Sequence, residues 1–157
     1  MGPLNIMASE RRRSMAAIET IDFEDEELDQ FGAAQIQNLP QTQLLDGYAC
    51  IQCSRCQDAC PAYETGKELS PSALEINKRY FINDHVSTIA NGESIDKALT
   101  DWMLTEEAAW SCTTCGYCVE VCPVGNEPMI DILRARQNLV MMESNFPQDA
   151  METFEKM

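Results

Sequence analysis

The chain has 157 residues, which is the length of one ordinary domain with short flanking segments. It carries 26 acidic and 11 basic side chains, so its formal net charge is -15. This charge argues against free nucleic-acid binding, because phosphate contacts require a basic surface. The acidic balance fits docking to a basic partner and simple solubility equally well. No apolar run approaches the roughly 20 residues that span a bilayer, and no signal peptide precedes the first cysteine.

Residues 1–35 are expected to form a disordered or linker segment. Its only dense basic cluster is Arg11, Arg12 and Arg13, and seven acids then crowd the eleven positions from Glu19 to Asp29. Such blocks of charge are usually solvated and poorly ordered. The alternative is that the arginines lie against an anionic cytoplasmic membrane leaflet.

Residues 36–145 are predicted to form one helical domain, followed by a C-terminal tail at 146–157. A short helix over 40–48 leads into the first cysteine. Ser70 and Pro71 together predict the start of a second helix, because serine caps helices and proline favours the first helical position.

The second predicted helix extends to Asp84. Ser94 is the expected cap of the next helix, whose apolar residues recur at spacings of three and four up to Met103. Thr105 begins another short turn. The longest candidate covers 129–142, and no segment alternates as a strand does, so the predicted fold class is all-α. The expected buried residues of that last helix are Met129, Ile132, Leu133, Leu139 and Val140.

All eight cysteines fall in two copies of one pattern, C-x2-C-x2-C-x3-C-P, at 50–61 and 112–123. Three cysteines separated by two residues each allow one tight loop to bind three corners of a [4Fe-4S] cube. In two-cluster ferredoxins the last cysteine of each motif binds the other cluster. The sequence therefore predicts two [4Fe-4S] clusters, with the two motifs folding around the metal together. The first predicted cluster takes Cys50, Cys53, Cys56 and Cys122, and the second takes Cys112, Cys115, Cys118 and Cys60.

Zinc and disulfides are the alternative uses of these cysteines. Zinc usually takes cysteines in separated C-x2-C pairs, which this spacing fits poorly. Disulfides require an oxidising compartment. The spacing favours clusters over both, and two clusters at roughly -2 each would bring the net charge to about -19.

The residues that flank the cysteines resemble those of a known family. The segments that carry the resemblance are 45–50, 61–63, 65–67, 69–71 and 110–116. They are similar to the ferredoxin module of heterodisulfide-reductase-related iron-sulfur oxidoreductases, over about residues 35–145. The resemblance implies an alpha-helical ferredoxin-like domain, as in the iron-sulfur subunits of succinate dehydrogenase and fumarate reductase, and the same eight cysteine ligands.

Many members of that family are longer than this chain. They place a haem-bearing membrane domain before the module, and residues 3–6 and 31–32 are similar to the linker that follows it. They also carry cysteine-rich C-C-G domains after the module. This chain contains no C-C-G sequence, so a fragment or a separately encoded subunit is expected.

The resemblance also implies partners and a location. The expected partners are a redox-protein donor and acceptor, such as a flavoprotein, a C-C-G-domain subunit or a haem membrane subunit. Membrane contact is expected only through another domain or a partner. The expected location is the cytoplasm or the cytoplasmic face of a membrane.

The predicted function is an electron-transfer module with two clusters, within a larger oxidoreductase. One alternative is the iron-sulfur subunit of a heterodisulfide-reductase-like or other dehydrogenase complex, active only with a catalytic partner, and another is that the clusters are structural. No nucleophile and base are recognisable, so no catalytic site is expected in the chain itself. His85 is expected to be a surface or packing residue. Arg55 is expected to favour reduction of the first cluster.

Overall fold

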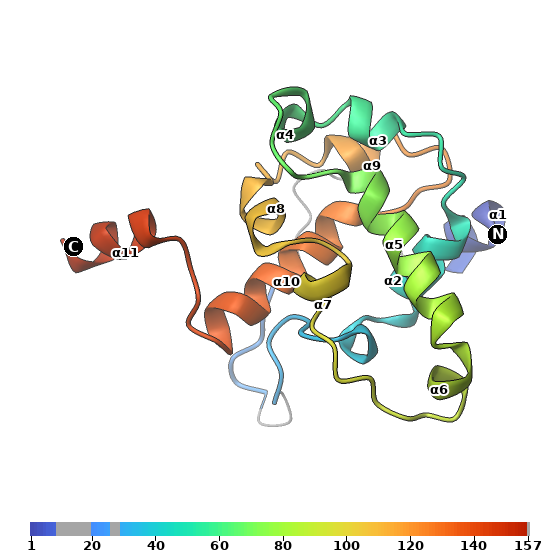
Figure 1. Ribbon diagram of the computed structural model, residues 1–157, viewed down its shortest axis with the longest axis horizontal. Helices are drawn as coiled ribbons and strands as arrows, with labels where there is room; N and C mark the ends of the chain where they lie inside the picture. Colours follow the sequence, from blue (N-terminus) through green and yellow to red (C-terminus); the bar gives the residue numbers. More distant parts are fainter. Residues whose placement is uncertain (9–19, 26–28, 157) are drawn as a thin grey trace.

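The computed structural model describes residues 1–8, 20–25 and 29–156. This part of the chain is helical and contains no β-strand (Figure 1), which confirms the all-α prediction. None of its helices has the length and apolar character that crossing a bilayer requires. The elements in order are α1 (Gly2–Ala8), the 3-10 helix η1 (Ile36–Asn38), α2 (Gln41–Ala49), α3 (Arg55–Asp58), α4 (Pro61–Glu64), α5 (Pro71–Asp84), α6 (Val86–Ala90), α7 (Leu99–Trp102), α8 (Glu106–Ser111), α9 (Tyr117–Glu120), α10 (Pro128–Met141) and α11 (Gln148–Glu155).

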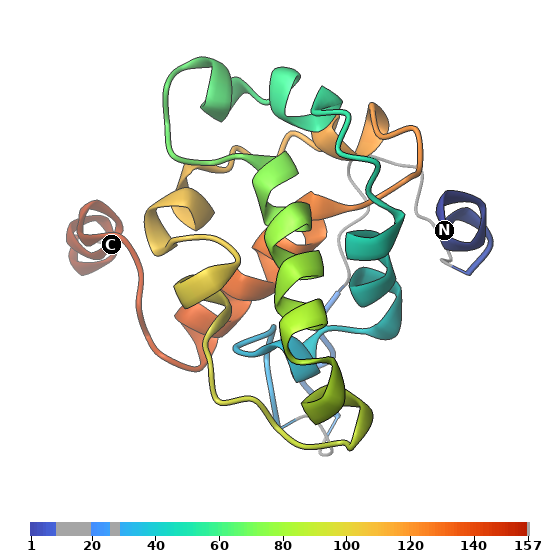
Figure 2. The same ribbon diagram turned by 45° about the vertical axis from the view of Figure 1, so that its right-hand side comes forward.

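The centre of the domain is the long helix α5, which stands in front of α10 in Figure 2. The Ser70 hydroxyl accepts a hydrogen bond from the Ala73 amide at 3.1 Å, and Pro71 occupies the first turn. This cap satisfies one amide that the helix leaves without a partner, and it confirms the predicted start. The helix ends at Asp84, as predicted.

The helix α10 has the same length as α5, 14 residues, and also begins with proline. Met129, Ile132 and Leu139 are buried, as predicted. Leu133 is only half-buried, and the prediction was wrong for Val140, which is 40% exposed. Each helical residue turns the side chain by about 100°, so Val140 lies well to the side of the stripe that contains its neighbour Leu139.

The helices form two similar sets. In the first, α5 packs against α2 and α3, and in the second, α10 packs against α8 and α9. Contacts between α3 and α9 and between α5 and α10 join the sets. Both motifs therefore lie in one body, with a short helix before each cysteine loop and a long helix behind it.

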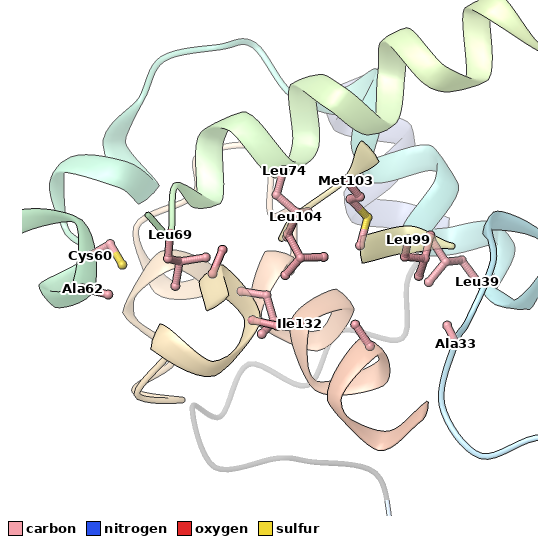
Figure 3. Packing of buried hydrophobic residues seen from close by; sticks show 13 residues of the cluster. Ala33, Leu39, Cys60, Ala62, Leu69, Leu74, Leu99, Met103, Leu104 and Ile132 are labelled. Carbon is pink, nitrogen blue, oxygen red and sulfur yellow. The ribbon is translucent and has the colours of Figure 1, made fainter. Parts of the chain in front are cut away.

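The main hydrophobic core lies between these sets. Leu74 of α5, Leu104 before α8 and Ile132 of α10 point toward one another in Figure 3, and all three are buried. Burying side chains of this size stabilises the fold by roughly 1.5–3 kcal/mol each. A second cluster forms around Phe81, whose ring stacks on Trp102 with the centroids 3.8 Å apart.

The helix that was predicted to begin after Ser94 is mostly absent. The chain stays non-helical up to Ala98, and only Leu99–Trp102 form α7. The reason is a competing backbone interaction: Ala98 forms an isolated antiparallel bridge with Gln35, and the Leu99 amide donates to the Ala34 carbonyl at 2.7 Å. The prediction that Ser94 caps a helix was therefore wrong. Thr105 does cap α8, because its hydroxyl accepts a hydrogen bond from the Ala108 amide at 3.1 Å.

The end segments contain helices that the sequence reading did not predict. At the N-terminus, α1 packs against α2 and its Asn5 side chain is buried. At the C-terminus, α11 projects away from the other helices (Figure 1). The arginine cluster at 11–13 lies outside the described residues. The domain boundaries at 35 and 145 stay predictions.

Candidate iron-sulfur site

The two cysteine loops have the same backbone shape. In the first loop, Gln52 and Ser54 have positive φ values of 57° and 61°. In the second, Thr114 and Gly116 have φ values of 54° and 72°. These residues occupy the same positions of the two motifs, one before and one after the second cysteine. Left-handed conformations are costly for non-glycine residues, so their repetition shows that the two sequences impose one loop geometry.

Cysteines from both motifs line one cavity between α3, α5 and α9. Cys50, Cys53 and Cys56 of the first motif border it together with Cys122, the last cysteine of the second. Cys118 also reaches its wall. The first predicted ligand set is therefore brought together around a common space.

The remaining cysteines also interact across the motifs. Cys60 is an electrostatic neighbour of both Cys112 and Cys118, and Cys115 interacts with the same two residues. Cys118 also interacts with Cys56 of the first predicted set. The two predicted sets are therefore close to each other.

A single metal ion and a [4Fe-4S] cube require different arrangements of the thiols. Among the described residues, no group of three histidine, cysteine, aspartate or glutamate side chains converges as the ligands of one ion would. A [4Fe-4S] cube requires a wider spacing, because each of its irons takes a different cysteine sulfur. Cys50, Cys53, Cys56 and Cys122, which line one cavity together with Cys118, fit that requirement.

Burial controls the protonation of the innermost thiols. Burial, with smaller contributions from the Cys122 and Cys50 thiolates, raises the pKa of Cys56 to about 12. Burial, with the Cys112 thiolate as the next cause, likewise raises the pKa of Cys118 to about 12. These thiols keep their protons near neutral pH, and only the thiolate binds metal. Cluster binding must therefore release protons from them.

Backbone amides point at the sulfurs. The Asn126 amide donates to Cys122 Sγ at 3.2 Å, and the Thr114 amide donates to Cys112 Sγ at 3.4 Å. Such hydrogen bonds stabilise negative charge on the sulfur and are one of the determinants of a cluster's reduction potential.

A buried ionic group lies behind the first cavity. Lys78 of α5 is fully buried, and its Nζ lies 2.5 Å from Asp131 Oδ2 and 3.2 Å from Glu75 Oε2. Nζ also donates to the Gln43 carbonyl oxygen at 2.8 Å. Glu75 itself lines the cysteine cavity. Burial raises the pKa of Glu75 to about 8, against the opposing effect of Lys78.

A polar network connects the N-terminal helix to the second motif. The Asn5 side chain donates to Asp46 Oδ1 at 2.5 Å and to Asn126 Oδ1 at 3.1 Å. Asn126 in turn donates from its side chain to the Asp46 carbonyl oxygen at 2.6 Å. The backbone amide of Asn126 also donates a hydrogen bond to Cys122 Sγ. Asn126 therefore links α1 and α2 to a predicted cluster ligand.

The sequence reading missed these buried polar residues. Glu75 and Lys78 stand three apart within an otherwise apolar helix face, which is a recognisable signal for an ion pair. Asp131 likewise stands three positions before Arg134, but its buried partner Lys78 lies 53 residues away in the sequence. Pairings of this kind become visible only when the long helices are placed side by side.

The structure also places the two other residues singled out in the sequence. His85 is half-buried, its ring stacks on Phe81 with the centroids 4.2 Å apart, and its Nδ1 lies 2.9 Å from the Phe81 carbonyl oxygen. It is a packing residue, as predicted. Arg55 lines the cysteine cavity, and its effect on the first cluster stays a prediction.

The helical fold and the paired cysteine loops define a two-cluster iron-sulfur protein of the ferredoxin type. Residues 46–126 match the family described as the 4Fe-4S dicluster domain, and the chain belongs to that family. It carries two [4Fe-4S] clusters and serves as an electron-transfer module.

Similar proteins are themselves redox proteins. The chain is 33% identical to the probable iron-sulfur-binding oxidoreductase FadF of Bacillus subtilis, over 95% of this chain and 26% of that protein. It is 32% identical to EtfAB:quinone oxidoreductase of Syntrophomonas wolfei, over 84% of this chain and 22% of that protein. It is 32% identical to the fumarate reductase iron-sulfur subunit of Escherichia coli O157:H7, over 55% of this chain and 33% of that subunit.

The chain spans about a quarter of the length of the first two relatives. No solved structure matches the chain closely enough to count as a relative.

Proposed function

We propose that this chain is the electron-transfer segment of a larger oxidoreductase and that each motif completes the other motif's cluster site. The observation that carries the proposal is the cavity where Cys50, Cys53 and Cys56 of the first motif meet Cys122 of the second, with Cys118 also in its wall. Cys122 is the fourth cysteine of its motif, and in two-cluster ferredoxins that cysteine binds the other motif's cluster. The same exchange is proposed for the second set, in which Cys60 is an electrostatic neighbour of Cys112 and Cys118.

The chain's own residues would hold the clusters and control access to them. When bound, the clusters supply two one-electron carriers. Cys60 and Cys118 are buried, so they would hold their clusters away from water. Cys53 and Cys115 are exposed and stand at equivalent positions of the two motifs. Each would bring one corner of its cluster to the surface, where a donor or an acceptor could approach.

For the larger protein we propose electron transfer between EtfAB and a quinone. The support is the name of the Syntrophomonas wolfei relative, EtfAB:quinone oxidoreductase, which is 32% identical over 84% of this chain. A relationship to heterodisulfide reductases, with a C-C-G-domain or haem subunit as partner, stays a prediction. A location at the cytoplasmic face of a membrane is part of the proposal, and a further relative named probable membrane-anchored ferredoxin supports it.

The first test is anaerobic analysis of iron and acid-labile sulfide in the reconstituted chain. About eight irons and eight sulfides per chain are expected from two four-iron clusters. Loss of cluster absorbance when the oxidised protein is mixed with reduced EtfAB would then support the proposed donor. Eight irons without reduction by EtfAB would refute the donor, and a colourless or zinc-loaded protein would refute the clusters.

A further inference from the structure

Arg79 of α5 holds the start of the first cysteine loop. Its Nε donates to the Gly47 carbonyl oxygen at 2.8 Å, and its Nη2 donates to the Cys50 carbonyl oxygen. Both acceptors belong to the C-terminal end of α2, where carbonyl groups lack partners within the helix. One guanidinium therefore binds the helix end and the first cysteine of the loop at the same time.

Arg136 of α10 does the same for the second loop. Its Nε donates to the Ala109 carbonyl oxygen at 2.8 Å, and its Nη2 donates to the Cys112 carbonyl oxygen at 2.5 Å. The guanidinium also lies over the Trp110 ring, 5.3 Å from its centroid. Half-burial and this cation-π contact fix the position of the charge.

The two arginines occupy equivalent places in the two helix sets. Each stands eight residues after the proline that begins a 14-residue helix. In each set the two acceptors are the first cysteine of the motif and the residue three positions before it. Two independent segments therefore build the same contact, although the chain between them differs.

Each arginine also brings a positive charge close to the first cysteine of its motif. Arg79 and Arg136 bind the carbonyl oxygens of Cys50 and Cys112, so each guanidinium holds a fixed positive charge next to one cysteine loop. Cys50 and Cys112 belong to different predicted clusters. Reduction adds one electron to a cluster, so a nearby fixed cation stabilises the reduced form more than the oxidised form.

We propose that Arg79 and Arg136 are positioning residues, one for each cluster, that hold the cysteine loop at its first ligand and raise the reduction potential of that cluster alone. The inference rests on the proposed function, because it assigns one arginine to each of the two clusters. A lysine at either position keeps the charge but loses the planar fork that reaches two carbonyls at once. The electrostatic and the geometric parts can therefore be separated.

The test uses the full chain, reconstituted anaerobically, with an electron paramagnetic resonance redox titration of each variant. We expect Arg79→Gln to lower one midpoint and Arg136→Gln to lower the other. The ratio of reduced to oxidised cluster at fixed potential should fall about tenfold, which is about 59 mV for one electron. Arg79→Lys and Arg136→Lys should recover most of the shift. Lys67→Gln, which removes a charge from an exposed side chain, should move neither midpoint.

Each result decides the inference. It is overturned if both glutamine variants move the same midpoint, if neither midpoint moves, or if lysine shifts a midpoint as far as glutamine does. If a glutamine variant binds only about four irons, selective loss of one cluster supports the assignment, and loss of both contradicts it. Wild-type protein without about eight irons would instead refute the proposed function.

Discussion

Replacing Lys78 with methionine tests the buried ionic group behind the first cavity. The side chain is fully buried, and Nζ lies 2.5 Å from Asp131 and 3.2 Å from Glu75. Methionine fills a similar volume but leaves both carboxylates without their cation. Since burial already raises the pKa of Asp131 to about 6 and that of Glu75 to about 8, the loss of Lys78 should raise both values further.

The expected cost is large because the site is closed to water. Removing one partner of a buried ion pair typically costs about 3–5 kcal/mol. In a domain of this size, 1 kcal/mol shifts the melting temperature by roughly 2–4 °C, so Lys78→Met should lower it by roughly 6–20 °C. The assay is anaerobic thermal unfolding of the cluster-loaded chain, followed by far-UV circular dichroism at one fixed scan rate.

A matched control comes from the C-terminal end of α11, where Lys156, just after the helix, and Glu152 form an ion pair of 3.6 Å whose side chains are 77% and 74% exposed. Water and salt screen such a pair, so Lys156→Met should leave the melting temperature unchanged. Adding Asp131→Asn to Lys78→Met should recover part of the loss, because it removes one unpaired carboxylate. An unchanged or raised melting temperature for Lys78→Met alone would refute the reasoning.

Two further predictions concern packing and pH. At Gly32, with φ of +74°, an added Cβ would lie 2.2 Å from the Arg134 carbonyl oxygen; at Gly66, with φ of +78°, it would meet nothing within 4 Å. Gly66→Ala should cost only the roughly 1–2 kcal/mol that a non-glycine residue loses in a left-handed conformation. Gly32→Ala should lower the free energy of unfolding, measured in urea, by well over that amount. Equal effects of the two substitutions would contradict the clash. The raised pKa of Glu75, about 8 against an ordinary 4.5, means that the folded state binds this proton more tightly than the unfolded state. The stability that Glu75 contributes is then fully present below about pH 4.5 and is lost as the pH rises toward 8. Glu75→Gln should therefore flatten the dependence of the melting temperature on pH between 6 and 8, and an unaltered slope would contradict the raised pKa of Glu75.

The sequence was most informative where one residue type has a specific chemical use. Eight cysteines in two copies of one spacing predicted both clusters, and Ser70 with Pro71 predicted α5 to the residue. These signals are local: a cap or a ligand loop is encoded within a few neighbouring positions. The all-helical fold followed from the absence of alternating segments.

The errors and omissions come from contacts between distant residues. The helix predicted after Ser94 is mostly replaced by extended chain that pairs with Gln35, because a tertiary hydrogen bond overrides weak local propensity. Asn5 reads as part of a solvated tail, yet its side chain is buried against Asp46. Arg136 reads as a polar position of a helix, and only its distance to the Cys112 carbonyl shows what it binds.

Single cysteine substitutions can show whether each motif supplies its fourth cysteine to the other motif's cluster. The measurement is the electron paramagnetic resonance spectrum of Cys56→Ser, Cys122→Ser, Cys118→Ser and Cys60→Ser during redox titration. We expect Cys122→Ser to perturb the same cluster signal as Cys56→Ser, and Cys60→Ser to perturb the same signal as Cys118→Ser. If Cys60→Ser instead perturbs the signal that Cys56→Ser perturbs, each motif holds its own cluster and the interlocked arrangement is wrong.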